Sequence, residues 1–357
     1  MNKIAIISEF NRNSVNYGNR LQNYAVQHFI EQGDNIVETI HNYKDYNIYK
    51  YRLKKFIKRF ANKESKAEKE RKKFFEKFNK ENIKFSKYTI SNKNISKNIN
   101  KNYDYFICGS DQIWNSNYKE NGFVNFLQFA DKEKRIALSP SFGTLKINSN
   151  YIDLYKKWIN EIPTLSVRED AGKKIIEELT GRKDVEVLID PTMLLTDEEW
   201  DKISKKPKML HSQKYILNYF LGELSQSRKE EINRVAKEND CEVINILDKN
   251  SPFYQTGPSE FLYLEKNAFL ICTDSFHSCV FAILYNRPFV VFEREDNTIS
   301  MNSRIETLIN KFQLENRIFN KCITEENIKH DYTDVYKILE QERKKSKEFL
   351  KKALEIE

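Results

Sequence analysis

The sequence predicts a two-domain α/β protein whose parallel sheets are connected by helices. The chain has 357 residues, and a length of roughly 150 residues is typical of one domain. Short apolar runs alternate with helix-like segments in two series, with a break near residues 191–212, and such alternation favours parallel sheets. Polar residues follow the ends of the predicted strands, where open α/β sheets bind their ligands.

The first series begins with an Ile-rich run at residues 3–8, which is typical of a buried parallel strand. A Gly-containing turn and a helix follow, because apolar residues recur at helical spacing from Leu21 to Ile30. Residues 50–85 are charged and helix-prone, and we expect an inserted helical hairpin or arm there. The remaining elements are predicted as strands at residues 35–40, 105–108, 135–139, 165–168 and 185–189 and as helices at 151–159 and 169–179.

The second series opens with a helix at residues 196–203, where Thr196 and Glu199 have the spacing of a capping box. Its strands are predicted at residues 215–221, 242–247, 268–273 and 289–292, and its other helices at 228–239, 258–266, 276–285 and 303–312. We therefore expect a first Rossmann-like domain at 1–195 with a helical insertion at about 50–100, a second at 196–330, and an amphipathic C-terminal helix within 331–357 that is able to pack back on the first domain.

The positive charge of the chain is concentrated in one segment. Residues 50–101 contain 19 Lys and Arg and 5 Glu, a net charge of +14, whereas the whole chain has a net charge of +8. Such a segment can contact an anionic membrane, an anionic substrate or nucleic acid, or it can be an ordinary solvated helix face. A peripheral membrane contact and a solvated face both stay open, and nucleic acid is the least expected partner.

The predicted location is the cytoplasm, with the inner membrane face as a peripheral site. The five cysteines form no CxxC pair, and those in apolar runs are typical of thiols in a reducing compartment. We expect no signal peptide, because the chain enters a strand at once. No apolar run approaches the roughly 18 residues of a membrane span.

Gly18 and Asn19 lie in a predicted strand-to-helix turn, where backbone N–H groups favour an anion. The alternative is a turn that needs glycine for its backbone angles. The sequence contains no GxGxxG and no GxxxxGK[ST] motif, so it gives no motif support for a dinucleotide or P-loop site.

Asp111 follows the predicted strand at 105–108 and stands beside the amides of Gln112 and Asn115 and the indole of Trp114. A carboxylate in this setting can act as a base or orient a sugar hydroxyl, and its neighbours can hold an acceptor. The alternative is an Asp that caps the next helix.

Arg168 and His277 are the other two candidates at strand ends. Arg168 offers a planar fork for phosphate or carboxylate, or it forms an ion pair with Glu169 or Asp170. His277 follows a buried strand, where a histidine is often a satisfied cap or core residue. The sequence has no GxSxG nucleophile elbow for a Ser-His-Asp triad, and its five histidines have no metal-ligand spacing, so we expect no metal site.

Six motifs in order resemble the polysaccharide pyruvyl transferase family. They are NYGNRLQNYAVQ from Asn16, CGSDQIWN from Cys108, SFG from Ser141, LSVRED from Leu165, VLIDPTMLL from Val187 and TDSFHSCVFAILYNRPFVVF from Thr273. The resemblance covers about residues 1–325, without the basic segment and the C-terminal helix. It implies two Rossmann-like domains in the arrangement of GT-B glycosyltransferases.

The resemblance also implies transfer of a pyruvyl group from phosphoenolpyruvate to two hydroxyls of a sugar, in a surface glycan or a lipid-linked precursor, to form a cyclic ketal. His277 matches the histidine of the family motif and is the expected general acid, and Asp111 is the expected base. Arg168 matches the Arg of the family's S-x-R motif and is expected to contact phosphoenolpyruvate. No metal or organic cofactor is expected.

Donor-binding roles are also expected for residues near these motifs, namely Gly18, Asn19, Ser275 and Arg304. Ser275 is a departure, since many members of the family have Arg two residues before the histidine; Arg287, Arg294 or Arg304 could compensate. Two alternatives stay open: a GT-B glycosyltransferase that uses a nucleotide-sugar donor, and a non-catalytic binding protein with a basic arm.

Overall fold

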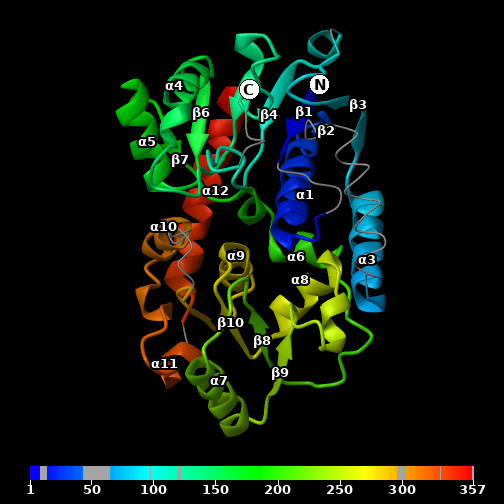
Figure 1. Cartoon of the computed structure of the whole chain (residues 1–357), viewed down its shortest axis with the longest axis vertical. Helices are drawn as coiled ribbons and strands as arrows, with labels where there is room; N and C mark the ends of the chain where they lie inside the picture. The colour runs from blue at the N-terminus through cyan, green and yellow to red at the C-terminus, as the bar shows by residue number, and fades with distance from the viewer. Residues whose placement is uncertain are drawn as a thin grey trace.

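The buried apolar runs form two separate sheets of parallel strands, and the predicted α/β fold class is confirmed (Figure 1). The structure is a computed structural model that describes residues 1–8, 14–42, 65–96, 98–118, 122–295, 303–329 and 331–355. The larger sheet has the order β3-β2-β1-β4-β5-β6-β7. Its strands are β1 (Lys3–Ile7), β2 (Ile36–Asn42), β3 (Phe85–Ile90), β4 (Tyr105–Cys108), β5 (Arg135–Ala137), β6 (Thr164–Val167) and β7 (Glu186–Val187).

The smaller sheet has the order β11-β10-β8-β9. Its strands are β8 (Tyr215–Tyr219), β9 (Glu242–Asn245), β10 (Leu270–Thr273) and β11 (Phe289–Val291). The central strand β10 pairs in parallel with β8 and with β11, and all four of its residues are buried. Burial on both faces explains why the LICT run lacks the polar alternation of a half-exposed strand.

Helices flank both sheets and connect their strands (Figure 1). They are α1 (Tyr17–Glu31), α3 (Lys66–Asn82), α4 (Ile152–Asn160), α5 (Asp170–Thr180), α6 (Asp197–Asp201), α7 (Gln226–Glu238), α8 (Pro258–Asn267), α9 (Phe276–Leu284), α10 (Ser303–Phe312), α11 (Glu325–Ile328) and α12 (Thr333–Ala353). The capping box predicted at Thr196 and Glu199 is present at the start of α6.

The basic segment differs from the predicted helical arm. Residues 50–64 of that prediction lie outside the described residues, and α3 is helical as predicted. Residues 85–90 instead form the edge strand β3, which pairs in parallel with β2. Sequence patterning missed this strand because its burial alternates imperfectly and the exposed Lys87 interrupts it, as is common for edge strands.

Helix α3 lies at the outer edge of the molecule and packs against α8 and residues 252–255 of the second half, rather than standing free (Figure 1). Its Arg71 is buried and donates hydrogen bonds to the carbonyl oxygens of Ile246 at 3.1 Å and Tyr254 at 2.8 Å. Tyr17 of α1 stacks on Phe261 of α8 with 4.5 Å between ring centroids. Tyr17 and Phe261 belong to one hydrophobic cluster that includes residues of both halves, so the two sheets are held together by a shared core.

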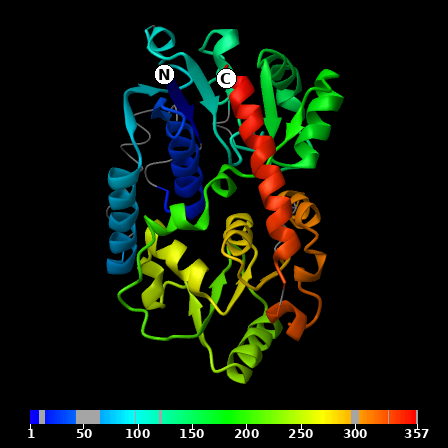
Figure 2. The same cartoon turned by 180° about the vertical axis from the view of Figure 1, so that it is seen from behind.

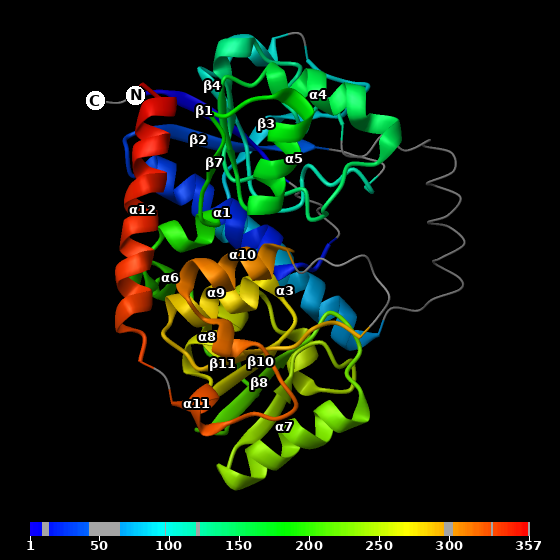
Figure 3. The ribbon, with the colours of Figure 1, turned by 90° about the vertical axis from the view of Figure 1, so that its left-hand side faces the viewer.

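The C-terminal helix α12 runs along both halves (Figures 2 and 3). Near its start, the hydroxyl of Tyr332 donates to the carbonyl oxygen of Arg287 in the second half. Further along, the buried Arg343 donates to the carbonyl oxygens of Met193 at 2.7 Å and Leu195 at 2.6 Å. The helix therefore fastens the linker after β7 to the second half of the chain.

In the described part of the chain, no helix combines the length and apolar character needed to cross a bilayer. All five cysteines are free thiols. Cys108 and Cys272 are buried as their apolar runs predict, whereas Cys241 is half-buried.

Candidate active site

A cavity of about 170 Å³ lies where the carboxyl ends of the two sheets face each other. Its lining residues come from both halves: Asn16, Asp111, Gln112, Tyr118, Tyr219, Leu221, Asp274, Ser275, Phe276, His277, Arg294, Arg304 and Ile305. Loops after β4, β8, β10 and β11 supply most of them. This is the place where open parallel sheets bind ligands, and a cavity with convergent polar groups is the usual candidate for an active site.

Two helices begin at this cavity. Asn16 caps α1, and its side chain accepts a hydrogen bond from the backbone N–H of Asn19 at 3.2 Å. Ser275 is the N-cap residue of α9, although its side chain makes no capping hydrogen bond. The absence of a Cβ at Gly18 lets α1 approach the imidazole of His277, the second residue of α9.

Asp111 has a left-handed backbone with φ of 71°, which is uncommon for a residue other than glycine and is often found at functional sites. Its carboxylate accepts hydrogen bonds from the backbone N–H of Gln112 at 2.8 Å and from the side-chain amide of Asn19. Arg168 and Arg304 lie 3.7 Å and 4.0 Å from the same carboxylate. These hydrogen bonds and the two guanidinium groups therefore hold the carboxylate of Asp111 in place at the cavity.

Behind the cavity lies a buried ion pair between Arg168 and Asp190, with 2.6 Å between Nη1 and Oδ2. Ser110 donates to the same oxygen at 2.9 Å, and Thr192 donates to the other oxygen through its backbone and its hydroxyl. Burial alone raises the pKa of Asp190, but Arg168, His277 and these hydrogen bonds outweigh it and hold the pKa at about 2.

His277 faces Asp190, with 3.8 Å between Nε2 and Oδ2. Among the described residues, this Nε2 has no hydrogen-bond partner. Burial lowers the pKa of His277, Asp190 and Asp111 oppose this effect, and the positive charges of Arg168 and Arg304 add to it. The imidazole is therefore neutral near pH 7 in the unliganded protein, and an anion in the cavity would favour its protonation.

Among the residues that the structure describes, the arginines that line the cavity are Arg294 and Arg304. Burial, together with repulsion from Arg168, lowers the pKa of Arg304 to about 10, so this side chain is still charged at pH 7. Arg294 is paired with Asp274 at 3.1 Å. Asp274 also accepts the backbone N–H groups of Leu221 and Gly222, which fixes the loop after β8 at the edge of the cavity.

The SFG motif, residues 141–143, packs against Gln112 in the lining of the cavity. The Oε1 atom of Glu169 accepts hydrogen bonds from the hydroxyl of Ser141 and from the backbone N–H groups of Phe142 and Gly143. Gly143 has φ of 62°, and a Cβ there would approach Cδ of Gln112 to 2.7 Å. The glycine thus provides both the turn and the room for Gln112.

Most of the predicted site residues meet at this cavity, either in its lining or directly against it: Gly18, Asn19, Asp111, Gln112, Ser275, His277 and Arg304. Arg168 lies behind the lining, with a side chain that is 1% exposed. The expected Arg-carboxylate pair exists, but its partner is Asp190 instead of Glu169 or Asp170.

The placement of Trp114 corrects the prediction that it contacts an acceptor. Trp114 is fully buried, its indole N–H donates to the carbonyl oxygen of Asn125, and its ring stacks on Phe126 at 4.9 Å. The aromatic cluster around it is part of the core of the first half. Asn115 is also buried, and its amide donates to Oε1 of Gln112 at 2.8 Å, so Asn115 supports Gln112 rather than lining the cavity.

Sequence reasoning did not assign Asp190, Asp274, Tyr118 and Tyr219 to the site, and it named Arg294 only as one of three arginines that could compensate for Ser275. Asp190 and Asp274 carried a signal, because each directly follows a predicted strand. Arg294 comes shortly after β11, and only the fold shows that it turns toward Asp274. Tyr118 and Tyr219 look like ordinary aromatic residues in the sequence.

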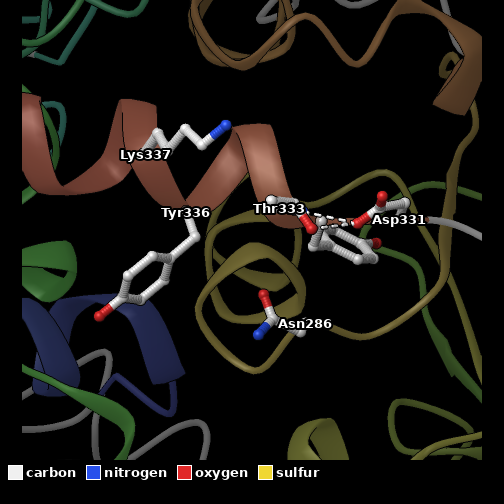
Figure 4. A pocket seen from close by; sticks show the side chains of 6 residues that line it. Asn286, Asp331, Thr333, Tyr336 and Lys337 are labelled. Atoms are coloured by element: carbon white, nitrogen blue, oxygen red, sulfur yellow. Dashed lines mark hydrogen bonds between the residues drawn. The ribbon is translucent and has the colours of Figure 1, made fainter.

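A second and larger groove of about 550 Å³ lies elsewhere, where α12 begins beside the end of α9 (Figure 4). Its polar side chains serve local structure: Asp331 accepts hydrogen bonds from Thr333, and Lys337 pairs with Asp334. It contains no residue of the predicted site. The smaller cavity between the sheets is therefore the candidate active site.

Two parallel-sheet halves with a polar cavity between their carboxyl edges define the GT-B architecture. Solved structures show the same fold. The chain is similar to UDP-GlcNAc 2-epimerase from Neisseria meningitidis bound to UDP-GlcNAc (TM-score 0.52, 12% identity, 97% of this chain and 94% of that chain covered). It is also similar to S. aureus MnaA with UDP (TM-score 0.50, 12% identity, 100% and 98% covered). The predicted GT-B-like arrangement is confirmed.

The family follows from the sequence. The model of the family described as polysaccharide pyruvyl transferase matches residues 16–297. The chain belongs to this family, as its motifs predicted, and is a transferase. The search of curated proteins finds no match.

Proposed function

We propose that the protein transfers the pyruvyl group of phosphoenolpyruvate to two hydroxyls of a sugar in a surface glycan or its precursor. The observation that carries this proposal is the meeting of His277, Asp111 and Arg304 at one small cavity. An imidazole, a carboxylate and a guanidinium are the acid, base and anion ligand that the reaction needs.

The size of the cavity supports a small donor. Its volume of about 170 Å³ is below the roughly 300–1,000 Å³ of pockets for drug-sized ligands. Phosphoenolpyruvate has three carbons, a phosphate and a carboxylate. In this proposal Arg304 and Arg294 bind the two anionic groups, and the sugar approaches from the side of Gln112 and Tyr118.

The chemistry begins with the donor. Its negative charge favours the imidazolium form of His277, which then protonates the methylene carbon C3 and leaves a cationic centre at C2. The first sugar hydroxyl adds to C2, and Asp111 accepts its proton. The bond between C2 and the phosphate oxygen then breaks.

The second hydroxyl closes the ketal at C2 after phosphate leaves. Asp111 passes the proton of the first hydroxyl to the departing phosphate, and the proton of the second hydroxyl replaces the one that His277 gave to C3. The products are one pyruvyl ketal and one phosphate. The step uses no oxidant, reductant or metal ion in this proposal.

The test is a titration of the purified protein with phosphoenolpyruvate and, separately, with UDP- and GDP-sugars. We expect binding of phosphoenolpyruvate that is weakened by Arg304→Ala. Binding of a nucleotide sugar without binding of phosphoenolpyruvate would contradict the proposal and favour a glycosyltransferase on the same fold.

A further inference from the structure

The position of Arg168 differs from that of a donor ligand. Its side chain is 1% exposed, and it does not belong to the lining of the cavity. Its guanidinium lies over the ring of Phe276 at 4.4 Å from the centroid, and Phe276 itself lines the cavity. An aromatic ring and the carboxylate of Asp111 therefore stand around Arg168 on the side of the cavity.

The contacts of Arg168 are directed at Asp190. Nη1 donates to Oδ2 of Asp190 at 2.6 Å and to the hydroxyl of Ser110 at 3.3 Å. Thr192 donates to the other carboxylate oxygen at 3.0 Å and 2.7 Å. With both oxygens bound, the Asp190 carboxylate has one fixed orientation, and in this orientation Oδ2 is 3.8 Å from Nε2 of His277.

We infer that Arg168 and Asp190 are positioning residues for His277: Arg168 fixes the Asp190 carboxylate, which faces the imidazole, sets its orientation and stabilises its protonated form. This role concerns the same site as the proposed function and rests on that function only for its effect on turnover. It assigns Arg168 to His277 instead of to the donor.

His277 is surrounded by two carboxylates and two guanidinium groups, so the loss of one carboxylate changes how readily the imidazole is protonated. Asp190 and Asp111 face the imidazole with negative charge, and Arg168 and Arg304 face it with positive charge. On the side of α1, the uncharged Gly18 packs against the ring. Loss of the Asp190 charge leaves two cations against one anion, which disfavours the imidazolium.

The first experiment measures the protonation of His277 directly by NMR of histidine-labelled protein with inorganic phosphate bound. The chain has five histidines, and His277→Gln identifies the signal. We expect Asp190→Asn to lower the pKa of His277 by about 1 or more, the usual effect of an opposite charge at this distance. An unchanged pKa, or a wild-type His277 that stays neutral down to about pH 5 with phosphate bound, would overturn the inference.

The second experiment measures how substitution of each of two arginines, Arg168 and Arg304, changes the affinity of the protein for inorganic phosphate. Arg168→Lys keeps the charge but loses the planar fork, and we expect its Kd to change by less than about 2-fold. We expect Arg304→Lys, which changes a lining residue, to weaken binding by about 10-fold. An equal loss of phosphate affinity in both variants would show that Arg168 binds the donor and would contradict the inference.

Measurements of kcat and KM distinguish a positioning role of Arg168 from a merely structural one. With phosphoenolpyruvate as substrate, Arg168→Lys should lower kcat and leave KM unchanged, and its pH profile should shift. If Asp190→Asn does not fold, the Arg168→Lys affinity decides the inference. If the wild-type protein binds neither phosphate nor phosphoenolpyruvate, the proposed function fails, and the NMR comparison repeated without phosphate decides the positioning role alone.

Discussion

Gly18 in the first half of the chain lies directly against His277 in the second half. A Cβ built at position 18 would come within 2.6 Å of Cγ of the imidazole and nearer still to Nδ1. Real Cβ atoms do not approach other atoms this closely, so the glycine is required for the ring to occupy its place. Two motifs far apart in the sequence, NYGN and DSFHS, meet in this contact.

Gly18→Ala should therefore displace the imidazole and lower kcat by about 10²-fold or more, the range expected when an acid-base group is misplaced. The matched control is Gly33→Ala near the end of the same helix, where the nearest atom is the side-chain amide of Asn35 at 3.3 Å. Steady-state kinetics of both variants check the prediction. Full activity of Gly18→Ala would show that the position of the ring does not matter.

His277→Ala should slow turnover by about 10²–10⁴-fold if the imidazole is the general acid. Binding of phosphoenolpyruvate should persist, because Arg294 and Arg304 remain in the cavity. Single-turnover kinetics at saturating donor measure this loss. Undiminished turnover would refute the acid role while leaving the fold and the family untouched.

The pH dependence of kcat/KM should follow the free enzyme's His277. Burial holds the pKa of His277 below its usual 6.5, and a general acid works only when it is protonated. Activity should thus fall as the pH rises through a value below about 6.5. A profile that rises through this range would assign the imidazole to a base instead.

Asp190 should stabilise the fold in a pH-dependent way. Its pKa is about 2 in the folded protein and 3.8 by reference, so its ionisation contributes about 2 kcal/mol above about pH 4. This contribution is lost as the pH falls toward 2, because the unfolded chain binds the proton more readily. Urea denaturation should show that the difference in unfolding free energy between wild type and Asp190→Asn narrows over this range; a constant difference would contradict the prediction.

Arg343→Ala should destabilise the protein by about 2–4 kcal/mol. The change leaves the buried carbonyl oxygens of Met193 and Leu195 without their donor, and each unsatisfied buried group costs about 1–3 kcal/mol. Lys337→Ala on the same helix removes only an exposed pair with Asp334 and should leave the stability nearly unchanged, because solvent screens such pairs. Equal effects in denaturant melts would show that α12 does not fasten the two halves.

The sequence predicted the parts of the fold that local pattern controls. Buried parallel strands such as β10 are continuous apolar runs, and these were found. The edge strand β3 was missed, because its burial alternates imperfectly and the exposed Lys87 interrupts the apolar pattern. The packing of α3 against the second half depends on hydrogen bonds from Arg71 to carbonyl oxygens that are distant in the sequence, and a local sequence pattern does not predict such long-range contacts.

The site was predictable where residues follow strand ends, since the fold brings those ends together. Asp111 and His277 were found in this way and line one cavity. Sequence could not tell which side chains point into the cavity. Trp114 and Arg168 follow strand ends as well, yet one is in an aromatic core and the other is paired behind the lining.

The most direct test of the account is mass spectrometry of the surface glycan from cells with and without this protein. We expect a glycan that carries a pyruvyl ketal only when the protein is present, with the ketal restored by the wild-type chain but not by His277→Ala. Glycans of identical mass in the two cells, or a difference of a whole sugar, would contradict it.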